Sequence, residues 1–174
     1  MAAAEPETGD GGGAGAGAAD FFRPEDHELI DQFLRPKMAG RPLPPAARFI
    51  HDADVCSAAP GDLAAAHEPA PGPPGADPVW YFFSPVRSHC GSRFSRYARF
   101  VRGSARGAWC ADRVGRRAEE GGAVVWYARQ FSFLARSAGR CWLSEWRMVE
   151  HGIMQEDGDQ RQLVLCKLFI SRES

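Results

Sequence analysis

Several features that would assign the chain to a class of protein are missing from its 174 residues. No run of about 18 apolar residues is present, so a membrane-spanning helix is not expected. The N-terminus lacks the basic start and apolar core of a signal peptide. The sequence contains five cysteines but no CxxC pair. An odd number of scattered cysteines is typical of free thiols in a reducing compartment, so these absences favour a protein that works inside the cell.

The motifs of common enzymatic chemistry are also missing. The sequence has no GxSxG elbow, no Walker loop, no Rossmann fingerprint and no HExxH helix. His89-Cys90 is one neighbouring pair of metal-ligand types, without the second pair that a zinc site needs. The glycine-rich stretch 103–107 is not followed by the lysine and helix of a phosphate loop. We therefore expect no enzyme, no metal, no cofactor and no small-molecule substrate.

Large apolar residues are absent from residues 1–19, which are acidic and rich in Ala and Gly. Such a segment cannot offset the entropy of ordering, so we expect a disordered tail. One domain is expected over 20–171, because 44% of the chain is apolar and can form a core. Only residues 172–174 then remain, which predicts that no activation domain follows.

Within this domain the patterns predict helices first and strands later. Apolar residues at helical spacing follow Pro24, and Arg35-Pro36 is expected to end this helix. Trp80 to Phe83 reads as a buried strand that Pro85 stops. Strands joined by turn signals imply an antiparallel sheet in an α+β fold. The other expected elements are an extended piece starting at 49–50, a short helix at 62–67, and strands at 123–133, 141–149 and 163–170.

Acidic residues are almost missing between Val86 and Arg117, where nine arginines stand against the single acid Asp112. The rest of the chain carries 12 basic residues against 21 acidic ones. With 19 Arg and 2 Lys in total, part of this excess reflects a general preference for arginine. The segregation nevertheless produces a local positive field, and aromatic residues are interleaved with the arginines. The segment is therefore a candidate polyanion-binding surface anchored on the sheet.

Separate blocks of the sequence, in order from Phe21 to Ile170, resemble the NAC domain of plant transcription factors. The motif WYFFSP is unchanged at 80–85, and the end of WIMHEYRL is similar to Glu145-Trp146-Arg147-Met148. The final WVLCRIF is similar to residues 163–169. The resemblance implies a twisted antiparallel sheet flanked by a few helices. It also implies a nuclear transcription regulator that binds double-stranded DNA and forms homodimers or heterodimers with other NAC proteins.

In the family, a sheet-edge strand with the motif WKATG enters the major groove, and an arginine precedes it. Trp109 matches the tryptophan, whereas Cys110 replaces the lysine and Asp112 the threonine. The preceding arginine is Arg102 when counted back from Trp109, or Arg96 when counted forward from Arg93. The neighbouring arginines are expected to compensate for the lysine through bidentate contacts. The predicted DNA-binding residues are Arg93, Arg96, Arg99, Arg102, Arg106, Trp109, Arg113, Arg116 and Arg117.

The resemblance also implies a dimer contact near the N-terminus, where the family pairs an arginine with an acid of the neighbouring subunit. Phe21 stands at the position of that arginine, whereas the acidic residue is retained as Glu28. The predicted dimerisation residues are Phe21, Phe22 and Glu28, although both phenylalanines are equally consistent with covering the sheet. An alternative function is a degenerate NAC module that has lost specific DNA reading and acts through protein interaction. A third is RNA binding through stacking by Phe94, Tyr97 and Phe100.

Overall fold

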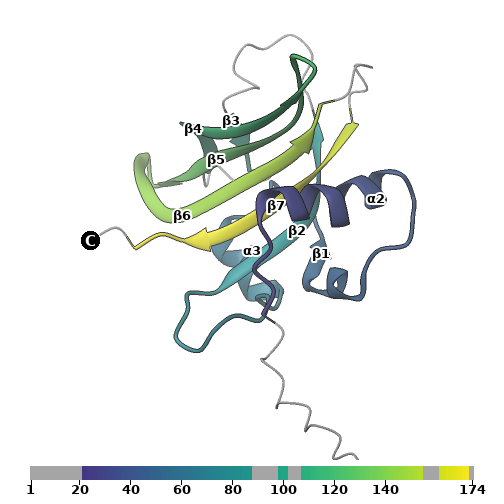
Figure 1. Ribbon diagram of the computed structural model, residues 1–174. Helices are drawn as coiled ribbons and strands as arrows, with labels where there is room; N and C mark the ends of the chain where they lie inside the picture. The colour runs from purple at the N-terminus through teal and green to yellow at the C-terminus, as the bar shows by residue number, and fades with distance from the viewer. Residues whose placement is uncertain (1–20, 88–97, 102–106, 155–160, 173–174) are drawn as a thin grey trace, which may run out of the picture.

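The computed structural model describes residues 21–87, 98–101, 107–154 and 161–172, and the predicted tail lies outside them. One seven-stranded sheet runs through this described part of the chain, with helical segments on its two faces (Figure 1). The strands lie side by side in the order β1-β2-β7-β6-β5-β4-β3. The α+β fold and the twisted sheet predicted from the sequence are confirmed.

The elements follow one another as the sequence patterns indicate. The helical segments are α1 (Asp26–Glu28), the π-helix η1 (Leu29–Leu34), α2 (Arg35–Met38), the 3-10 helix η2 (Pro45–Phe49) and α3 (Pro60–Ala66). The strands are β1 (Ile50–Asp52), β2 (Val79–Arg87), β3 (Ala98–Phe100), β4 (Gly107–Glu120), β5 (Ala123–Ser137), β6 (Arg140–Ile153) and β7 (Arg161–Ile170). The short helix and three later strands predicted from the sequence are confirmed as α3, β5, β6 and β7.

The expectation of a purely antiparallel sheet is wrong at one edge, where β1 runs parallel to β2. Ile50 pairs with Tyr81 and Asp52 with Phe83. A parallel pair needs a long connection between its strands, and the chain between β1 and β2 includes α3. The other strand pairs of the described residues are antiparallel.

The N-terminal helix begins with a capping box and an acidic first turn. The backbone N–H of Glu25 donates to Oε2 of Glu28 at 2.8 Å, and the Glu25 side chain accepts from the backbone of the same turn. Acidic side chains in this turn also interact favourably with the positive end of the helix dipole. The helix start predicted at Pro24 is thus held by local hydrogen bonds.

Arg35-Pro36 does not end this helix as predicted, because the chain stays helical through Met38. Pro36 follows directly on the π-helical turn of η1, in which the N–H of Arg35 donates to the carbonyl of Ile30 five residues back, and the helix continues through it into α2. The helix ends instead at Gly40, which has a φ of 65°. Its N–H donates to Lys37 O at 3.2 Å, and the next N–H donates to Pro36 O at 2.9 Å. These two bonds form a Schellman motif.

Pro85 does not stop β2, which continues to Arg87. The carbonyl of Phe83 accepts a hydrogen bond from Ala53, so the polar backbone groups of Phe83 point toward β1. Alternation along the strand places the nitrogen of Pro85 on the same side, beyond the end of β1. A proline costs no ladder hydrogen bond at such an edge position.

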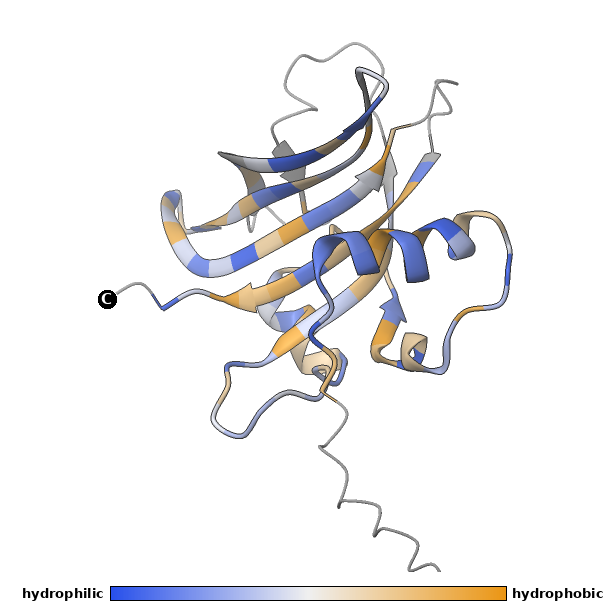
Figure 2. Ribbon diagram, viewed as in Figure 1, coloured by the Kyte–Doolittle hydropathy of each residue, from blue (hydrophilic) through white to orange (hydrophobic). Residues whose placement is uncertain are grey.

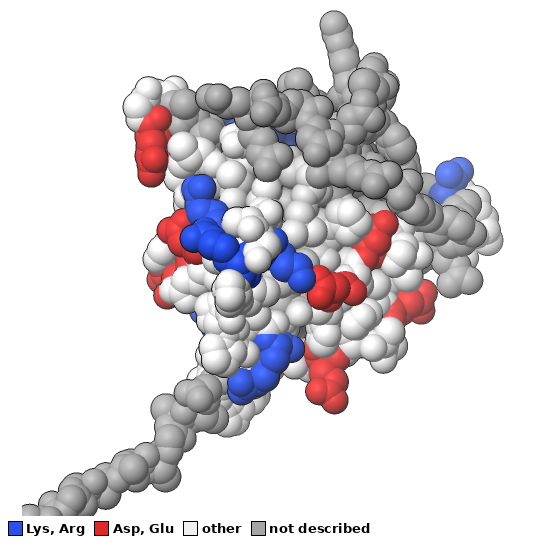
Figure 3. All heavy atoms as spheres, turned by 90° about the vertical axis from the view of Figure 1, so that its right-hand side faces the viewer, with Lys and Arg blue, Asp and Glu red and all other residues white. Residues whose placement is uncertain are grey.

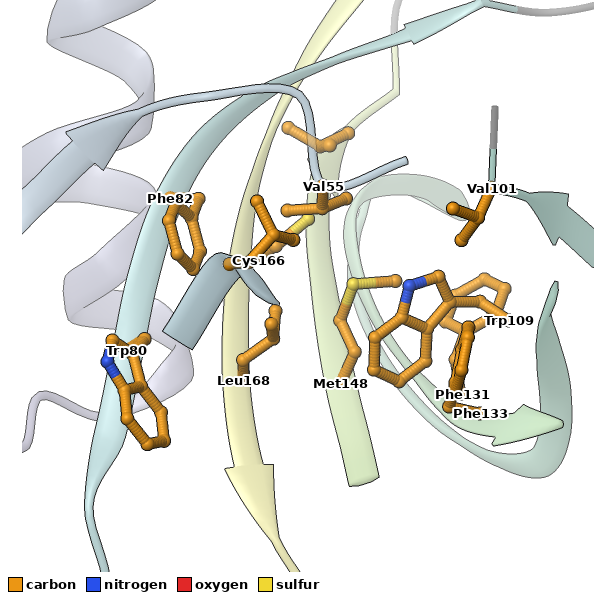
Figure 4. Close-up of a cluster of buried hydrophobic side chains, with 12 residues drawn as sticks. Val55, Trp80, Phe82, Val101, Trp109, Phe131, Phe133, Met148, Cys166 and Leu168 are labelled. Atoms are coloured by element: carbon orange, nitrogen blue, oxygen red, sulfur yellow. The ribbon is translucent and has the colours of Figure 1, made fainter. Parts of the chain in front are cut away.

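Two apolar clusters, one on each face, fix the sheet. The helix of α1, η1 and α2 covers one face, where Leu29 and Phe33 pack with Tyr81 of β2. Leu63 of α3 and Trp80 belong to the cluster on the opposite face (Figure 4). The middle of β7 is hydrophobic, whereas β4 carries long hydrophilic stretches (Figure 2). The two clusters therefore hold the centre of the sheet and leave polar side chains on β4.

Candidate nucleic-acid interface

Trp109 holds β4, the long strand of the arginine-rich segment, against the rest of the sheet. Its side chain is 0% exposed, and its ring lies 5.0 Å from the ring of Phe133 on β5. Met148 and Val101 belong to the same cluster (Figure 4). The indole nitrogen finds no hydrogen-bond partner within the described residues, so the strand is fixed by burial of the ring. Trp109, which is among the predicted DNA-binding residues, positions β4 from inside the core.

A bulge interrupts β4 a short distance beyond this anchor. Ala111 pairs with Phe131 and Gly115 with Arg129, so the residues between them lie opposite Gln130 alone. Extra residues on one strand bend it, increase its local twist and change the direction of its side chains. The bulge therefore decides how the second half of β4 presents its arginines.

Asp112 lies inside this bulge and binds back to β5. Its carboxylate accepts hydrogen bonds from Oγ of Ser132 at 2.9 Å and from Nε2 of Gln130 at 3.1 Å. Cys110, on the same strand, has a thiol whose pKa is raised by burial and further by the charge of Asp112. The thiol is thus neutral at pH 7, and the carboxylate is held toward the neighbouring strand.

Arg116 and Arg117 are the predicted DNA-binding arginines whose side chains are described, and both are exposed. Arg116 stands opposite Ala128 and Arg117 opposite Tyr127. Since successive side chains of a strand alternate, these two arginines lie on opposite faces of the sheet. For Arg99 in β3 and Arg113 in the bulge, the structure describes only the backbone. Outside the described residues lie Arg93, Arg96, Arg102 and Arg106, as well as Phe94 and Tyr97.

Arg116 also contacts the start of the N-terminal helix. Its Nε donates to Oδ2 of Asp26 at 2.6 Å, and Oδ1 of Asp26 lies 2.7 Å from Nε2 of His151 on β6. The His151 ring is 0% exposed, and its Nδ1 donates to the backbone oxygen of Leu165 at 3.1 Å. The hydrogen bond with His151 lowers the pKa of Asp26 below its ordinary value, and the charges of His151 and Arg116 act in the same direction against the effect of burial.

Further cationic groups surround this carboxylate. Burial lowers the pKa of Lys167 on β7, the charge of Asp26 opposes that shift, and the nearby Arg23 and Arg116 add to it. The charges of Asp26, Lys167, Arg23 and Arg116 therefore influence one another at the junction between the helix start and the sheet.

The predicted dimerisation residues divide between core and surface. Phe22 is 5% exposed, and its ring lies 5.0 Å from Tyr81 and 5.4 Å from Phe33. It belongs to the core of its own subunit, where it covers the sheet. Phe21 is 44% exposed. Glu28 is partly buried and accepts the capping hydrogen bond of its own helix.

The face shown in Figure 3 has no large area of one charge sign among the described residues. Blue and red side chains are intermingled there. Two ion pairs of the N-terminal helix show the same mixture, Arg35 with Asp31 at 3.1 Å and Lys37 with Asp52 at 3.1 Å. A surface of alternating charges offers a polyanion little net attraction, so the described residues of this face add little to an interface with a polyanion.

Sequence reasoning missed Asp26 and His151, which lie 125 positions apart and form one hydrogen bond. It also missed Arg23, whose Nη1 donates to the backbone oxygens of Phe22 at 2.9 Å and Pro71 at 3.2 Å. The position of Asp26 in the first turn of a helix indicated only where that helix begins. No local pattern indicated its partners on the sheet.

Comparison with known proteins decides the family. A family model described as "No apical meristem (NAM) protein" matches residues 18–153, which is most of the chain. The chain belongs to the NAC family. Two relatives from Arabidopsis thaliana are similar to it: NAC domain-containing protein 41, 28% identical over 158 residues, and NAC domain-containing protein 83, 26% identical over 159 residues.

Each alignment covers 88% of this NAC chain. It covers 53% of the first relative and 57% of the second, so the chain spans about half the length of each. No helix among the described residues of this NAC domain is long and apolar enough to cross a membrane.

Proposed function

We propose that this NAC domain is a nuclear transcription regulator that binds double-stranded DNA through β4, β3 and the arginine-rich segment around them. It works as a binding module and not as an enzyme. The observation that carries the proposal is the construction of β4. Trp109 fixes the strand in the core, while Arg116 and Arg117 extend from its second half into solvent. A rigid strand with exposed arginines suits phosphate contacts, which supply most of the affinity for DNA.

We expect this domain to prefer particular DNA sequences less strongly than family members that carry the WKATG motif. At the lysine position Cys110 is neutral, and Asp112 is engaged with Ser132 and Gln130. Neither residue supplies a cation to a phosphate or a base edge. The arginines therefore carry the interaction.

Fluorescence anisotropy of the full chain with a short duplex tests this function. A CACG-core duplex, the type of site that the family resemblance implies, is compared with a scrambled duplex over a series of salt concentrations. Tighter binding to the core sequence is expected, with a log–log salt slope of roughly 0.9 per phosphate contacted. Replacing Arg116 and Arg117 together by Gln should reduce that slope, whereas replacing Arg35 and Arg48, which lie outside β3 and β4, together by Gln should not. Absence of binding at low salt contradicts the proposal.

The second candidate function is a NAC module that pairs with other NAC proteins without reading DNA. The neutral thiol of Cys110 in place of the lysine favours it. Equal, salt-sensitive binding to both duplexes, together with co-purification of a second NAC protein, would support this function over the first.

For dimerisation we propose Phe21 as the exposed apolar contact, together with Glu28 of the helix. Phe21→Ala should shift the chain toward the monomer in sedimentation experiments if this contact is used. Phe22→Ala should instead lower stability, because Phe22 is a core residue.

A further inference from the structure

Arg116 is fixed at one end of its guanidinium and open at the other. Its Nε donates to Asp26 at 2.6 Å, yet the side chain is still 70% exposed. Within the described residues, Asp26 is the one partner found for it. The contact occupies Nε, and the two terminal nitrogens are left to face solvent. These nitrogens form the pair that binds a phosphate or a guanine edge in bidentate fashion.

The other carboxylate oxygen of Asp26 is in contact with His151. A backbone carbonyl only accepts hydrogen bonds, so the 3.1 Å contact with Leu165 O requires a proton on Nδ1 of His151. Nε2 lies 2.7 Å from the carboxylate oxygen Oδ1 of Asp26. The buried ring is thus fixed by two partners, one at each nitrogen. The Asp26 side chain, 18% exposed, is therefore anchored before Arg116 reaches it.

We propose that Asp26 is a positioning residue for DNA binding, which orients Arg116 so that its terminal nitrogens bind a backbone phosphate. This inference rests on the proposed function and names a contact within it. A free arginine loses rotamer freedom when it binds, and an arginine already held at Nε loses less of it. The Asp26 carboxylate is paired with Arg116, so it does not repel the phosphate as an isolated acid would.

The proposal predicts an effect of unusual sign. Removing an acidic residue from a DNA-binding surface normally strengthens binding, because a long-range repulsion disappears. If Asp26 positions Arg116, however, removing its charge weakens binding. Asp31 is the matched control, because it lies on the same helix and also pairs with an arginine, Arg35, at 3.1 Å.

The experiment compares the full-length wild type with Asp26→Asn, Asp31→Asn and Arg116→Gln, using anisotropy with the same duplex and thermal unfolding of each variant. Asp26→Asn should lower the affinity on the order of tenfold and reduce the salt slope by roughly 0.9. Arg116→Gln should have the same effect. A chain that carries both Asp26→Asn and Arg116→Gln should lose no more affinity than either single variant. Asp31→Asn should leave affinity unchanged or slightly increased.

Arg116→Lys tests the idea without disturbing Asp26, in case Asp26→Asn fails to fold. A lysine has a single ammonium group and cannot hold Asp26 and a phosphate in the same way, so Arg116→Lys should lose about as much as Arg116→Gln. Arg35→Lys, on the helix and outside the proposed interface, should leave the affinity unchanged. Wild-type affinity for Arg116→Lys, or tighter binding by a folded Asp26→Asn, overturns the positioning role while the proposed function stands. A wild-type chain that binds no duplex overturns both.

Discussion

Asp26 connects three elements through one side chain. It lies in the first turn of the N-terminal helix, accepts from Arg116 of β4 and contacts His151 of β6. Hydrogen bonds that involve a charged group are among the stronger polar contributions to stability. The carboxylate therefore contributes to folding as well as to the orientation of the arginine.

The stability of the chain should consequently depend on Asp26 in acid. Its folded-state pKa lies below the ordinary value of 3.8, first because of the hydrogen bond with His151. A depressed pKa stabilises the fold above the unfolded pKa, and this stabilisation is lost as the pH falls through the folded pKa. Denaturant unfolding of the wild type should thus lose stability below about pH 4. The free energy of unfolding of Asp26→Asn should be lower by about 1–3 kcal/mol at pH 7, and it should change less with pH in acid. Parallel curves of unfolding free energy against pH for the two proteins would contradict the assignment.

At the scale of elements, the bulge of β4 is the feature with the largest expected influence on the interface. The Asp112 carboxylate closes it by accepting from Ser132 and Gln130, and Ser132 is buried. A buried hydroxyl that loses its acceptor carries a desolvation penalty. The bulge is therefore stable only while the acid is in place.

Asp112→Ala should destabilise the domain by about 1–3 kcal/mol. Amide exchange should become faster between Ala111 and Gly115 and remain slow in β7. Asp31→Ala is the matched control, since it removes an exposed i,i+4 pair of the helix and should cost less than about 0.5 kcal/mol. Unchanged exchange in the bulge would show that Asp112 does not hold it.

The helical spacing of the first helix and the apolar runs of β2, β5 and β7 were sufficient to predict those elements. Pro36 and Pro85 misled the prediction because the effect of a proline depends on where its missing N–H would point. Pro85 stands on a free strand edge, where that group has no partner, and Pro36 follows the π-helical turn of η1. Strand direction at β1 depends on a connection and not on local pattern.

The candidate site was predictable in part for similar reasons. Arg116 and Arg117 were found because the excess of arginine is visible in the sequence. The Asp26–His151 contact joins residues 125 positions apart and leaves no local trace. The burial of Trp109 could be recognised only once Phe133 and Met148 were seen to enclose it.

At the scale of the whole molecule, the last strand has a central place. β7 lies between β2 and β6, with Val79 paired to Phe169 on one side and Met148 to Leu168 on the other. Its removal would expose both clusters of the core. The two halves of the sheet have no other common strand in the described part of the chain.

A chain that ends at Gln160 should therefore lose cooperative unfolding altogether, and should not behave as a smaller stable domain. Circular dichroism during heating and limited proteolysis provide the measurement. A chain that ends at Arg172 keeps all of β7 and should unfold like the full chain. A sharp thermal transition in the shorter chain would contradict this view.

The position of β7 also has a consequence for biosynthesis. Of the described strands, this ten-residue strand is the last that the ribosome makes, so the nascent chain holds β2 and β6 with open edges until β7 has emerged. Unpaired edges are templates for association with other chains. We expect the domain to complete its folding only after β7 has emerged, and to rely on chaperones during the interval in which the centre of its sheet is still missing.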